Sequence, residues 1–296
     1  MTDHAALRKS RLMIAAAMTI FGTIALFVRN IAVSSAEIAL YRAVMATLLL
    51  GSFFLISGQR IDFRSISKEL PLLLLSGMAM GINWILLFEA YRYTTVSVAT
   101  LSYYFAPVIV TVACPVLFKE KMGAKQWICF FMSTLGIVLI TGTGDLSVSD
   151  SHFTGILFGL GAAVLYAFVV LMNKFIKGVA GIQRTFLQFA AAVAILLPYV
   201  LLSGGFTLGS LNGTGWINLL IVGIVHSGLA YCLYFSALKD IPGQEAAILS
   251  YIDPLVAVAV SVSILGEQLT LLQLLGGILI LGFTLLNEIK TENRGK

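Results

Sequence analysis

Residues 97–126, SVATLSYYFAPVIVTVACPVLFKEKMGAKQ, return in altered form as residues 244–273, QEAAILSYIDPLVAVAVSVSILGEQLTLLQ. Aligned without a gap, the two stretches pair Pro107 with Pro254 and Glu120 with Glu267, at an offset of 147 residues. The same register also pairs Gly81 with Gly228, Phe88 with Phe235, Ala90 with Ala237, Ala99 with Ala246, Tyr104 with Tyr251 and Gln126 with Gln273. A proline inside an apolar run, an acid at its end and a glutamine just beyond it keep one spacing. The chain is therefore interpreted as an internal duplication, which is typical of secondary transporters.

The composition excludes a soluble protein. The 296 residues are 59% hydrophobic and only 11% charged, with a mean hydropathy of +0.97, which is more apolar surface than a soluble core could hide. Ten apolar runs are long enough to span a bilayer: 12–29, 36–57, 70–92, 95–118, 124–142, 154–176, 182–203, 214–238, 244–265 and 270–289. Because these runs are continuous rather than alternating, they predict helices and not barrel strands.

The basic residues predict the orientation. If the N-terminus is cytoplasmic, sixteen of the nineteen Lys and Arg residues fall in segments on the inside. We therefore expect a multi-pass protein of the plasma (inner) membrane with both ends in the cytoplasm. Arg8, Lys9 and Arg11 precede an apolar run that has no small-residue cleavage site after it, so we expect this run to be retained as the first helix. The net charge of +5 is explained by topology, and we expect no nucleic-acid partner.

The ten spans divide into two repeats, predicted at residues 1–144 and 154–290. Each repeat holds five helices, and an odd number forces the second copy to enter the membrane from the opposite side. The predicted fold is all-α and integral to the membrane, with ten transmembrane helices arranged as two inverted five-helix repeats around a central cavity. In such transporters the substrate binds near the midplane between the repeats, and access alternates between the two sides.

The chain resembles the EamA branch of the drug/metabolite transporter superfamily. The resemblance is carried by Tyr104-Phe-Ala-Pro107 through Glu120 and Gln126, and by Tyr251-Ile-Asp-Pro254 through Gly266-Glu267 and Gln273 to Gly276. It implies a ten-helix basket whose central cavity is lined mainly by helices 1, 3, 4, 6, 8 and 9. The size is similar to that of the aromatic amino acid exporters. Cys129 stands where the second repeat has Gly276, which should weaken the close packing of helix 5.

Pro107 and Pro254 are the predicted hinges. Each lies near the middle of its run, removes an amide donor and frees the carbonyl four residues earlier, which belongs to Tyr103 or Ser250. A freed carbonyl in hydrocarbon must find a partner or line a wet cavity, so the kinks should face the cavity. The alternative is a packing kink that neighbouring Ser or Thr side chains satisfy.

Aromatic residues make up the predicted substrate site. Gly77, Gly81, Trp84 and Phe88 share one face of helix 3, and Ile224, Gly228, Tyr231 and Phe235 form the matching face of helix 8. An aromatic cavity suits a flat or apolar substrate or a cation. The alternative is that these rings only fill helix contacts. The predicted substrate-binding residues are Trp84, Tyr103, Tyr104, Tyr166, Tyr231, Ser250 and Tyr251.

Four ionisable residues lie within the spans and are candidates for coupling or for polar substrate contact: Arg42, Glu89, His226 and Asp253. Each costs about 2.5 to 3.5 kcal/mol at full depth unless it is paired or hydrated. Arg42 and Glu89 lie near the outer ends of their helices and are expected to pair. The alternatives are that Arg42 binds a substrate carboxylate or that Glu89 carries a proton.

His226 and Asp253 replace Ala79 and Ala106 of the first repeat. Polar groups that only one half contains are candidates for substrate or proton chemistry, and a buried histidine beside a carboxylate could titrate near neutral pH. The alternative is a satisfied polar contact within the bundle. Glu120 and Glu267 precede helices 5 and 10, where a carboxylate can cap free amides, and both are interpreted as structural.

The leading functional hypothesis is a secondary transporter of a small organic metabolite, and the resemblance favours an exporter of amino acids or related compounds. An alternative is efflux of another non-phosphorylated metabolite or of a drug-like cation. There is no G-x-x-x-x-G-K-[ST] loop for ATP, and the spans lack the deep lysines that a phosphorylated cargo would need. An intramembrane enzyme is disfavoured, because His226 and Ser227 point about 100° apart on a helix. We expect no cofactor and no metal, and the partners are a small-molecule substrate and the lipid bilayer, with a monomer favoured over a dimer.

Overall fold

The computed structural model describes residues 2–58, 61, 66–118, 123–141, 150–176, 178–179, 181–238, 241 and 243–288. These residues form helices and connecting turns, with no strand among them. Nine helices of this part are long and apolar enough to cross a membrane. They match nine of the ten predicted spans. The remaining span, predicted at 244–265, is divided between two shorter helices. The predicted all-helical membrane fold is confirmed.

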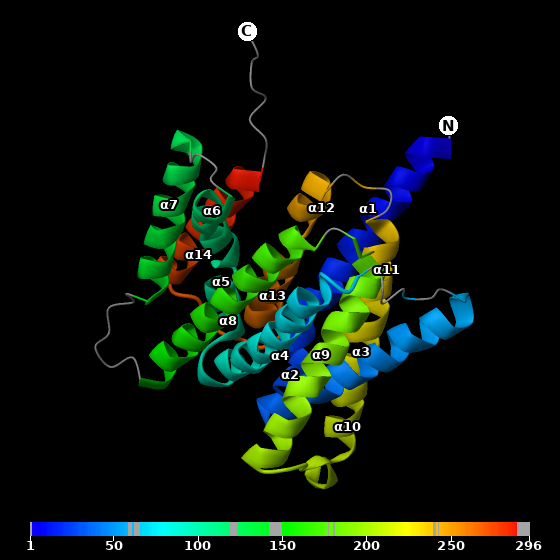
Figure 1. Ribbon diagram of the computed structural model, residues 1–296. Helices are drawn as coiled ribbons and strands as arrows, with labels where there is room; N and C mark the ends of the chain where they lie inside the picture. The colour runs from blue at the N-terminus through cyan, green and yellow to red at the C-terminus, as the bar shows by residue number, and fades with distance from the viewer. Residues whose placement is uncertain are drawn as a thin grey trace.

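The first repeat contains α1 to α7 (Figure 1). α1 (Thr2–Gly22) and α2 (Ile24–Val28) form the first span, and α5 (Val96–Tyr103) and α6 (Ala106–Phe118) form the fourth. The other three spans are the single helices α3 (Ser35–Ser57), α4 (Leu70–Tyr93) and α7 (Ala124–Thr141).

The second repeat contains α8 to α14. α8 (Asp150–Phe175) and α9 (Gly181–Ser203) are single helices, and a short 3-10 turn (Leu208–Ser210) follows. The eighth span joins α10 (Gly213–Leu220), a π-helix (Ile221–Leu229) and α11 (Ala230–Ala237). α12 (Gly243–Leu249) and α13 (Ile252–Ser263) form the ninth span, and α14 (Leu271–Glu288) the tenth.

The offset found in the sequence relates whole helices. Moved by 147 residues, the bounds of α7 become those of α14, and the bounds of α3 fall one residue from those of α9. The beginning of α1 and the end of α14 lie on the same side of the molecule (Figure 1). Both observations agree with two inverted repeats of five spans each.

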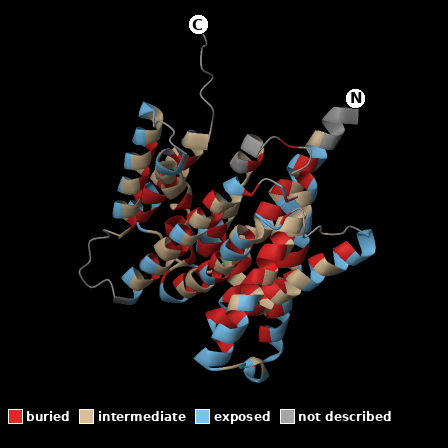
Figure 2. Ribbon diagram, in the orientation of Figure 1, coloured by how far each residue is buried: buried red, intermediate tan, exposed pale blue. Residues whose placement is uncertain are grey.

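The main core joins the two repeats. Its largest fully buried side chains include Leu40 and Phe88 of the first repeat and Phe189 and Leu196 of the second. α4 packs on both α8 and α9, so the red buried residues in Figure 2 gather along these helices. The packing of α4 on α8 and α9 therefore joins the two halves of the molecule.

α7 and α14 form a pair at the edge of the bundle. Only 22% and 28% of their spans are buried, against 39% or more for the other candidate spans. A Cβ added at Gly136 would meet the backbone of Gly276, and one added at Gly276 would meet the backbone of Gly136. The expected loss of close packing at Cys129 is wrong, because Gly136 supplies the close approach and Cys129 itself is buried.

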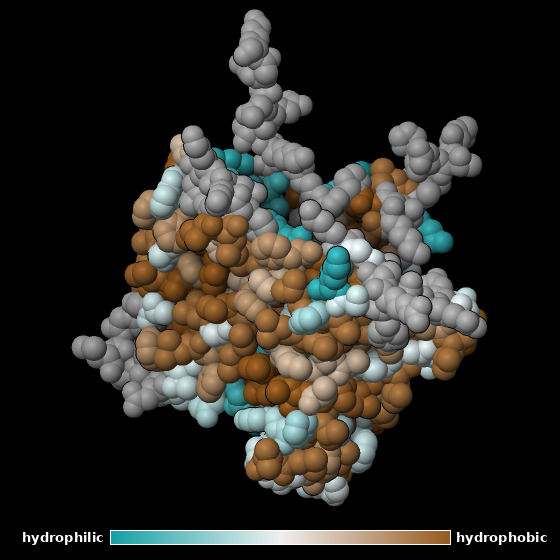
Figure 3. Space-filling model, viewed as in Figure 1, coloured by the Kyte–Doolittle hydropathy of each residue, from teal (hydrophilic) through white to brown (hydrophobic). Residues whose placement is uncertain are grey.

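The outer surface is apolar over most of the described residues. Figure 3 shows a broad brown surface over the middle of the molecule, with hydrophilic patches toward its ends. Leu55, Ile56 and Leu202 are each at least 85% exposed. Exposure on this scale is typical of a surface that faces lipid.

Candidate functional site

The fourth and ninth spans are interrupted at equivalent positions. The gap between α5 and α6 contains Tyr104, and the gap between α12 and α13 contains its counterpart Tyr251. Pro107 and Pro254 consequently lie in the first turns of α6 and α13, where a missing N–H leaves no intrahelical hydrogen bond unmade. At each predicted kink a turn of two residues divides the span into two helices. Such backbone is tolerated within a membrane only where protein or a cavity surrounds it.

Asp253 is held beside one of these breaks. The Tyr104 hydroxyl donates to Asp253 Oδ2 at 2.8 Å and lies 3.5 Å from the carbonyl oxygen of Ser250. That carbonyl also accepts from the Asp253 backbone N–H at 3.3 Å. The acceptor predicted at Ser250 is therefore present and engaged, and a tyrosine of one repeat binds an acid of the other.

Four of the predicted tyrosines form a continuous array. Ring centroids are 5.4 Å apart for Tyr166 and Tyr103, 6.0 Å for Tyr103 and Tyr104, and 6.3 Å for Tyr104 and Tyr251. Tyr166 is 40% exposed, while Tyr103 and Tyr104 are partly exposed, as is Asp253. We call these four tyrosines the tyrosine array. It joins the two repeats beside a carboxylate that is not sealed from its surroundings.

Arg42 lies in a second aromatic cluster. Its Nε donates to Ser227 Oγ at 2.8 Å, and its guanidinium lies 4.6 Å from the centre of the Trp84 ring. The phenol of Tyr231 is an electrostatic neighbour. The Arg42 residue is only 5% exposed. A cation is thus held against a ring face and a neutral hydroxyl.

The expected pairing of Arg42 with Glu89 is wrong. Within the described residues, Glu89 faces Arg92 of the same helix, with 3.8 Å between Oε1 and Nη1. Both side chains are partly exposed at the outer end of α4. Arg42 points instead toward the second repeat, because the π-helix brings Ser227 to it.

Two aromatic contacts near Arg42 obey the internal symmetry. The offset pairs Arg42 with Phe189 and Trp84 with Tyr231. The ring centroids of Phe189 and Tyr231 are 5.2 Å apart, and this contact is the equivalent of the one between Arg42 and Trp84. The ring centroid of Phe189 also lies 5.3 Å from that of Trp84. Phe21 completes the cluster, 5.0 Å from Tyr231. The two halves thus place a cation and a phenyl ring at equivalent positions.

Arg42 and Asp253 interact electrostatically with each other and with Tyr103 and Tyr231. Neither charge is paired directly with the other, because Asp253 is bound by Tyr104 and Arg42 by Ser227. The two aromatic groups therefore hold a guanidinium and a carboxyl group, each bound by a neutral hydroxyl.

His226 lies apart from Asp253. Its Nε2 is 3.1 Å from Thr23 Oγ1, its Nδ1 is 3.3 Å from the carbonyl oxygen of Ile221, and its ring centre is 5.2 Å from that of Phe27. Described contacts do not join the two side chains. The break between α1 and α2 contacts both residues: a Cβ at Gly22 would meet the Asp253 carbonyl oxygen, and Thr23 bonds His226.

The glycine faces of the third and eighth spans are packing surfaces. Gly77 and Gly81 of α4 lie against α9, where added Cβ atoms would meet Gln188, Ala191, Ala192 and Leu196. Gly223 and Gly228 of the π-helix lie against Met45 and Leu49 of α3. Trp84 and Phe88 are buried, at 5% and 0% exposure. The glycines allow the close approach expected of them, and the burial of Trp84 and Phe88 agrees with the alternative that these rings fill helix contacts, while Tyr231 remains partly exposed.

An ion pair ties the repeats together at the end of the bundle that the distribution of Lys and Arg predicts to be the outer side. Arg29 bonds Glu267, and its other nitrogens donate to the carbonyl oxygens of Tyr91 at 2.8 Å and Thr94 at 3.0 Å. Glu267 also accepts from the Val96 N–H at 2.8 Å and from the Ser261 hydroxyl. We call this the outer contact. It joins the end of α2, the start of α5 and the loop before α14.

Glu267 therefore caps α5 and does not cap α14, contrary to the prediction. α14 is capped by Thr270 and Gln273, whose side chains exchange hydrogen bonds with each other's backbone at 3.0 and 3.2 Å. Gln126 accepts equivalently from the Gly123 N–H at 2.5 Å. The paired glutamines are thus the caps of both final helices. Glu120 lies outside the described residues.

A second ion pair joins Arg11 of α1 to Glu245 of α12, at the opposite end of the first span. We call this the inner contact. The first span is therefore bound to the second repeat at both of its ends. Sequence reasoning missed Arg29 and Thr23, because a surface cation and a lone threonine carry no pattern that distinguishes them.

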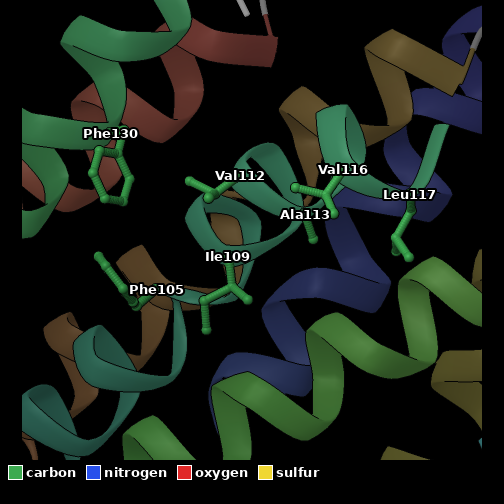
Figure 4. Close-up of a pocket in the computed structure, with 7 residues that line it drawn as sticks. All are labelled: Phe105, Ile109, Val112, Ala113, Val116, Leu117 and Phe130. Carbon is green, nitrogen blue, oxygen red and sulfur yellow. The ribbon is translucent and has the colours of Figure 1, made fainter. Parts of the chain in front are cut away.

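A pocket of about 470 Å³ lies elsewhere, between α6 and α7 (Figure 4). All seven lining residues are apolar: Phe105, Ile109, Val112, Ala113, Val116, Leu117 and Phe130. Val116 is 79% exposed, so the pocket faces the region that lipid occupies. It has no polar group to orient a metabolite, and we do not assign it to the substrate.

The fold, together with the two aromatic groups that hold Arg42 and Asp253, is that of an inverted-repeat membrane transporter. The chain belongs to the EamA-like transporter family, which is part of the drug/metabolite transporter superfamily. The family model matches residues 8–142 and again residues 153–288. An uncharacterized transporter of Bacillus subtilis, YxxF, is 30% identical over 94% of this chain and 88% of its own. An uncharacterized transporter of Archaeoglobus fulgidus is 29% identical over 90% and 92%. An uncharacterized inner membrane transporter of Salmonella typhimurium, YicL, is 22% identical over 89% and 88%.

A solved crystal structure has the same overall fold. It superposes with a TM-score of 0.62 over 93% of this chain and 96% of its own, at 16% sequence identity. This likeness concerns the fold alone.

Proposed function

We propose that the protein is a secondary transporter that exports amino acids or related organic amines by alternating access. The observation that carries the proposal is Asp253, a carboxylate within the ninth span that Tyr104 of the other repeat holds beside the tyrosine array. An acid beside an array of tyrosine rings suits an ammonium group, which gains both ionic and cation–π attraction. The export direction follows the resemblance to amino acid exporters.

The proposed location is the plasma membrane, with both ends of the chain in the cytoplasm. The distribution of Lys and Arg along the sequence supports this orientation. The shared side of the α1 start and the α14 end is consistent with it (Figure 1).

Transport by purified protein in liposomes tests the proposal. A labelled amino acid panel is offered to wild type, Asp253→Asn and the control Glu69→Gln, which removes an acid at the start of α4, away from the site. Because a hydrogen bond to a charged group is worth about 1.5 to 3 kcal/mol, Asp253→Asn, which removes the charge that attracts the ammonium group, should lower the initial rate by at least about tenfold. Glu69→Gln should transport as wild type does. If wild type moves no member of the panel, the proposal is wrong.

Efflux of a drug-like cation is the second candidate, because Asp253 and the tyrosine array would also attract a cation that has no carboxylate. Tetraphenylphosphonium and ethidium extend the panel for this purpose. Movement of these cations without any amino acid favours the second candidate. The same assay with and without a pH gradient, on wild type and His226→Ala, tests proton coupling. If neither the pH gradient nor His226→Ala changes the transport rate, a proton route through His226 is excluded.

A further inference from the structure

In the part of the chain that the structure describes, Arg42 is a cation with no directly bonded anion. Within the described residues no carboxylate forms an ion pair with it, and its Nε is taken by the neutral Ser227 hydroxyl. A charge at membrane depth costs about 2.5 to 3.5 kcal/mol when nothing compensates it. Trp84 and Tyr231 supply partial compensation but no opposite charge. The two terminal nitrogens of the guanidinium are the pair with which arginine binds a carboxylate.

The backbone of the second repeat is adapted to this cation. The eighth span widens into a π-helix at Ile221–Leu229, whereas the equivalent part of α4 is a regular α-helix. Within the π-helix, Ser227 donates to the carbonyl oxygen of Val222 at 3.0 Å and accepts from Arg42. Wide helical turns of this kind occur frequently at functional sites. Ser227 therefore orients the guanidinium from the opposite repeat.

The symmetry isolates the feature further. At the position equivalent to Arg42 the second repeat has Phe189, which packs on Tyr231 as Arg42 packs on Trp84. A scaffold role would be met equally well by an apolar residue in both halves. One half alone contains a cation, and Asp253, the acid in its electrostatic range, is likewise present in one half alone.

We infer that Arg42 binds the carboxylate of the substrate while Asp253 binds its ammonium group, so that the substrate class is free amino acids. The inference rests on the proposed function and narrows it, because an organic amine without a carboxylate would leave Arg42 uncompensated. Between the two charges, the tyrosine array and the Trp84–Phe189–Tyr231 cluster suit an apolar or aromatic side chain.

Competition by a matched series of compounds tests the inference. Counterflow of labelled L-phenylalanine, or of the panel amino acid with the highest rate, is competed with the free acid, its carboxamide and its N-acetyl derivative. For wild type, the carboxamide and the N-acetyl derivative should each compete at least about tenfold less well than the free acid, since each lacks one charge. A carboxamide that competes as well as the acid overturns the role of Arg42 and leaves the amine transporter standing. No movement of any amino acid overturns both.

Variants distinguish recognition from a structural role. In Arg42→Gln the preference for acid over carboxamide should fall to about twofold or less, because the discriminating charge is gone. The control Arg92→Gln removes a guanidinium at the outer end of α4 and should keep the wild-type preference. If Arg42→Gln does not fold, Ser227→Ala retains the cation and should weaken the preference several-fold. A folded Arg42→Gln that keeps the full preference contradicts the inference, as does an unchanged preference in Ser227→Ala.

Discussion

At the scale of single residues, the site consists of two charges that are each held by a neutral hydroxyl. Tyr104 holds Asp253, and Ser227 holds Arg42, and in both cases the hydroxyl comes from the repeat opposite to the charge. A neutral partner leaves each charge able to bind a ligand. A direct ion pair between them would satisfy both and close the site.

Tyr104→Phe tests this arrangement. The variant keeps the ring in the tyrosine array and removes one hydrogen bond to a carboxylate, so KM for the transported amino acid should rise by about tenfold, in keeping with a bond to a charged group. Initial transport rates over a range of substrate concentrations measure the change. The control is Tyr234→Phe, whose ring packs on Phe235 outside the array and whose KM should stay at the wild-type value. An unchanged KM in Tyr104→Phe would show that the hydroxyl does not position Asp253 for binding.

The tyrosines of the site could be predicted from the sequence, but their polar partners could not. Tyr104 and Tyr251 follow from the repeat, which places both at the breaks. Whether His226 and Asp253 touch could not be read from the sequence, and in the structure His226 faces Thr23 at a break in the first span. No proline or glycine pair in α1 marks that break as the prolines mark the other two.

At the scale of helices, irregular backbone lies beside the charges: Tyr104 and Asp253 lie at the interruptions of the fourth and ninth spans, and Ser227, the partner of Arg42, lies in the π-helix of the eighth. The two proline breaks were predictable, since a proline inside an apolar run restricts the backbone wherever it occurs. The π-helix was not, because one extra residue in a turn leaves the hydrophobic pattern almost unchanged. It nevertheless decides which residue of the eighth span meets Arg42.

Because α4 packs closely on α9, larger side chains are poorly tolerated on the face of α4 that meets α9. A Cβ at position 77 would lie 2.7 Å from the Cα of Gln188 and 2.8 Å from the Cβ of Ala191. Gly77→Ala should therefore destabilise the protein by about 1 to 3 kcal/mol, as overpacking does. Thermal unfolding in detergent measures the effect. In the control Gly282→Ala the new methyl group meets open space, and the variant should unfold at or slightly above the wild-type temperature. An equal result for both variants would contradict the packing described.

At the scale of the whole molecule, the first span is bound to the second repeat at both ends. The inner contact joins Arg11 to Glu245, and the outer contact joins Arg29 to Glu267. Alternating access requires the two sides to open in turn, so each contact should separate once in every cycle. The architecture of two repeats was predictable from one conserved spacing, while these contacts depend on side-chain reach that sequence spacing does not encode.

Reversible cross-linking tests this motion. Cysteines replace Arg29 and Glu267, or Arg11 and Glu245, in a chain whose Cys114, Cys129 and Cys232 are changed to serine. A short bis-methanethiosulfonate, which joins the two thiols of either pair through reducible disulfides, should stop transport, and reduction should restore it, because a closed contact blocks one half of the cycle. The same chains before cross-linking serve as controls. Full transport by either cross-linked pair would mean that this contact stays closed throughout.

The equivalence of Arg42 and Phe189 also bears on how such a molecule could arise. Two separate copies of the first repeat, associated about a two-fold axis, would bring two arginines to the positions that Arg42 and Phe189 now occupy, and like charges at that depth repel. Joining the copies into one chain removes the requirement that both halves be identical. Within one chain the two halves are free to differ, so that a single charge of each sign, and with it the orientation proposed for the cargo, becomes possible.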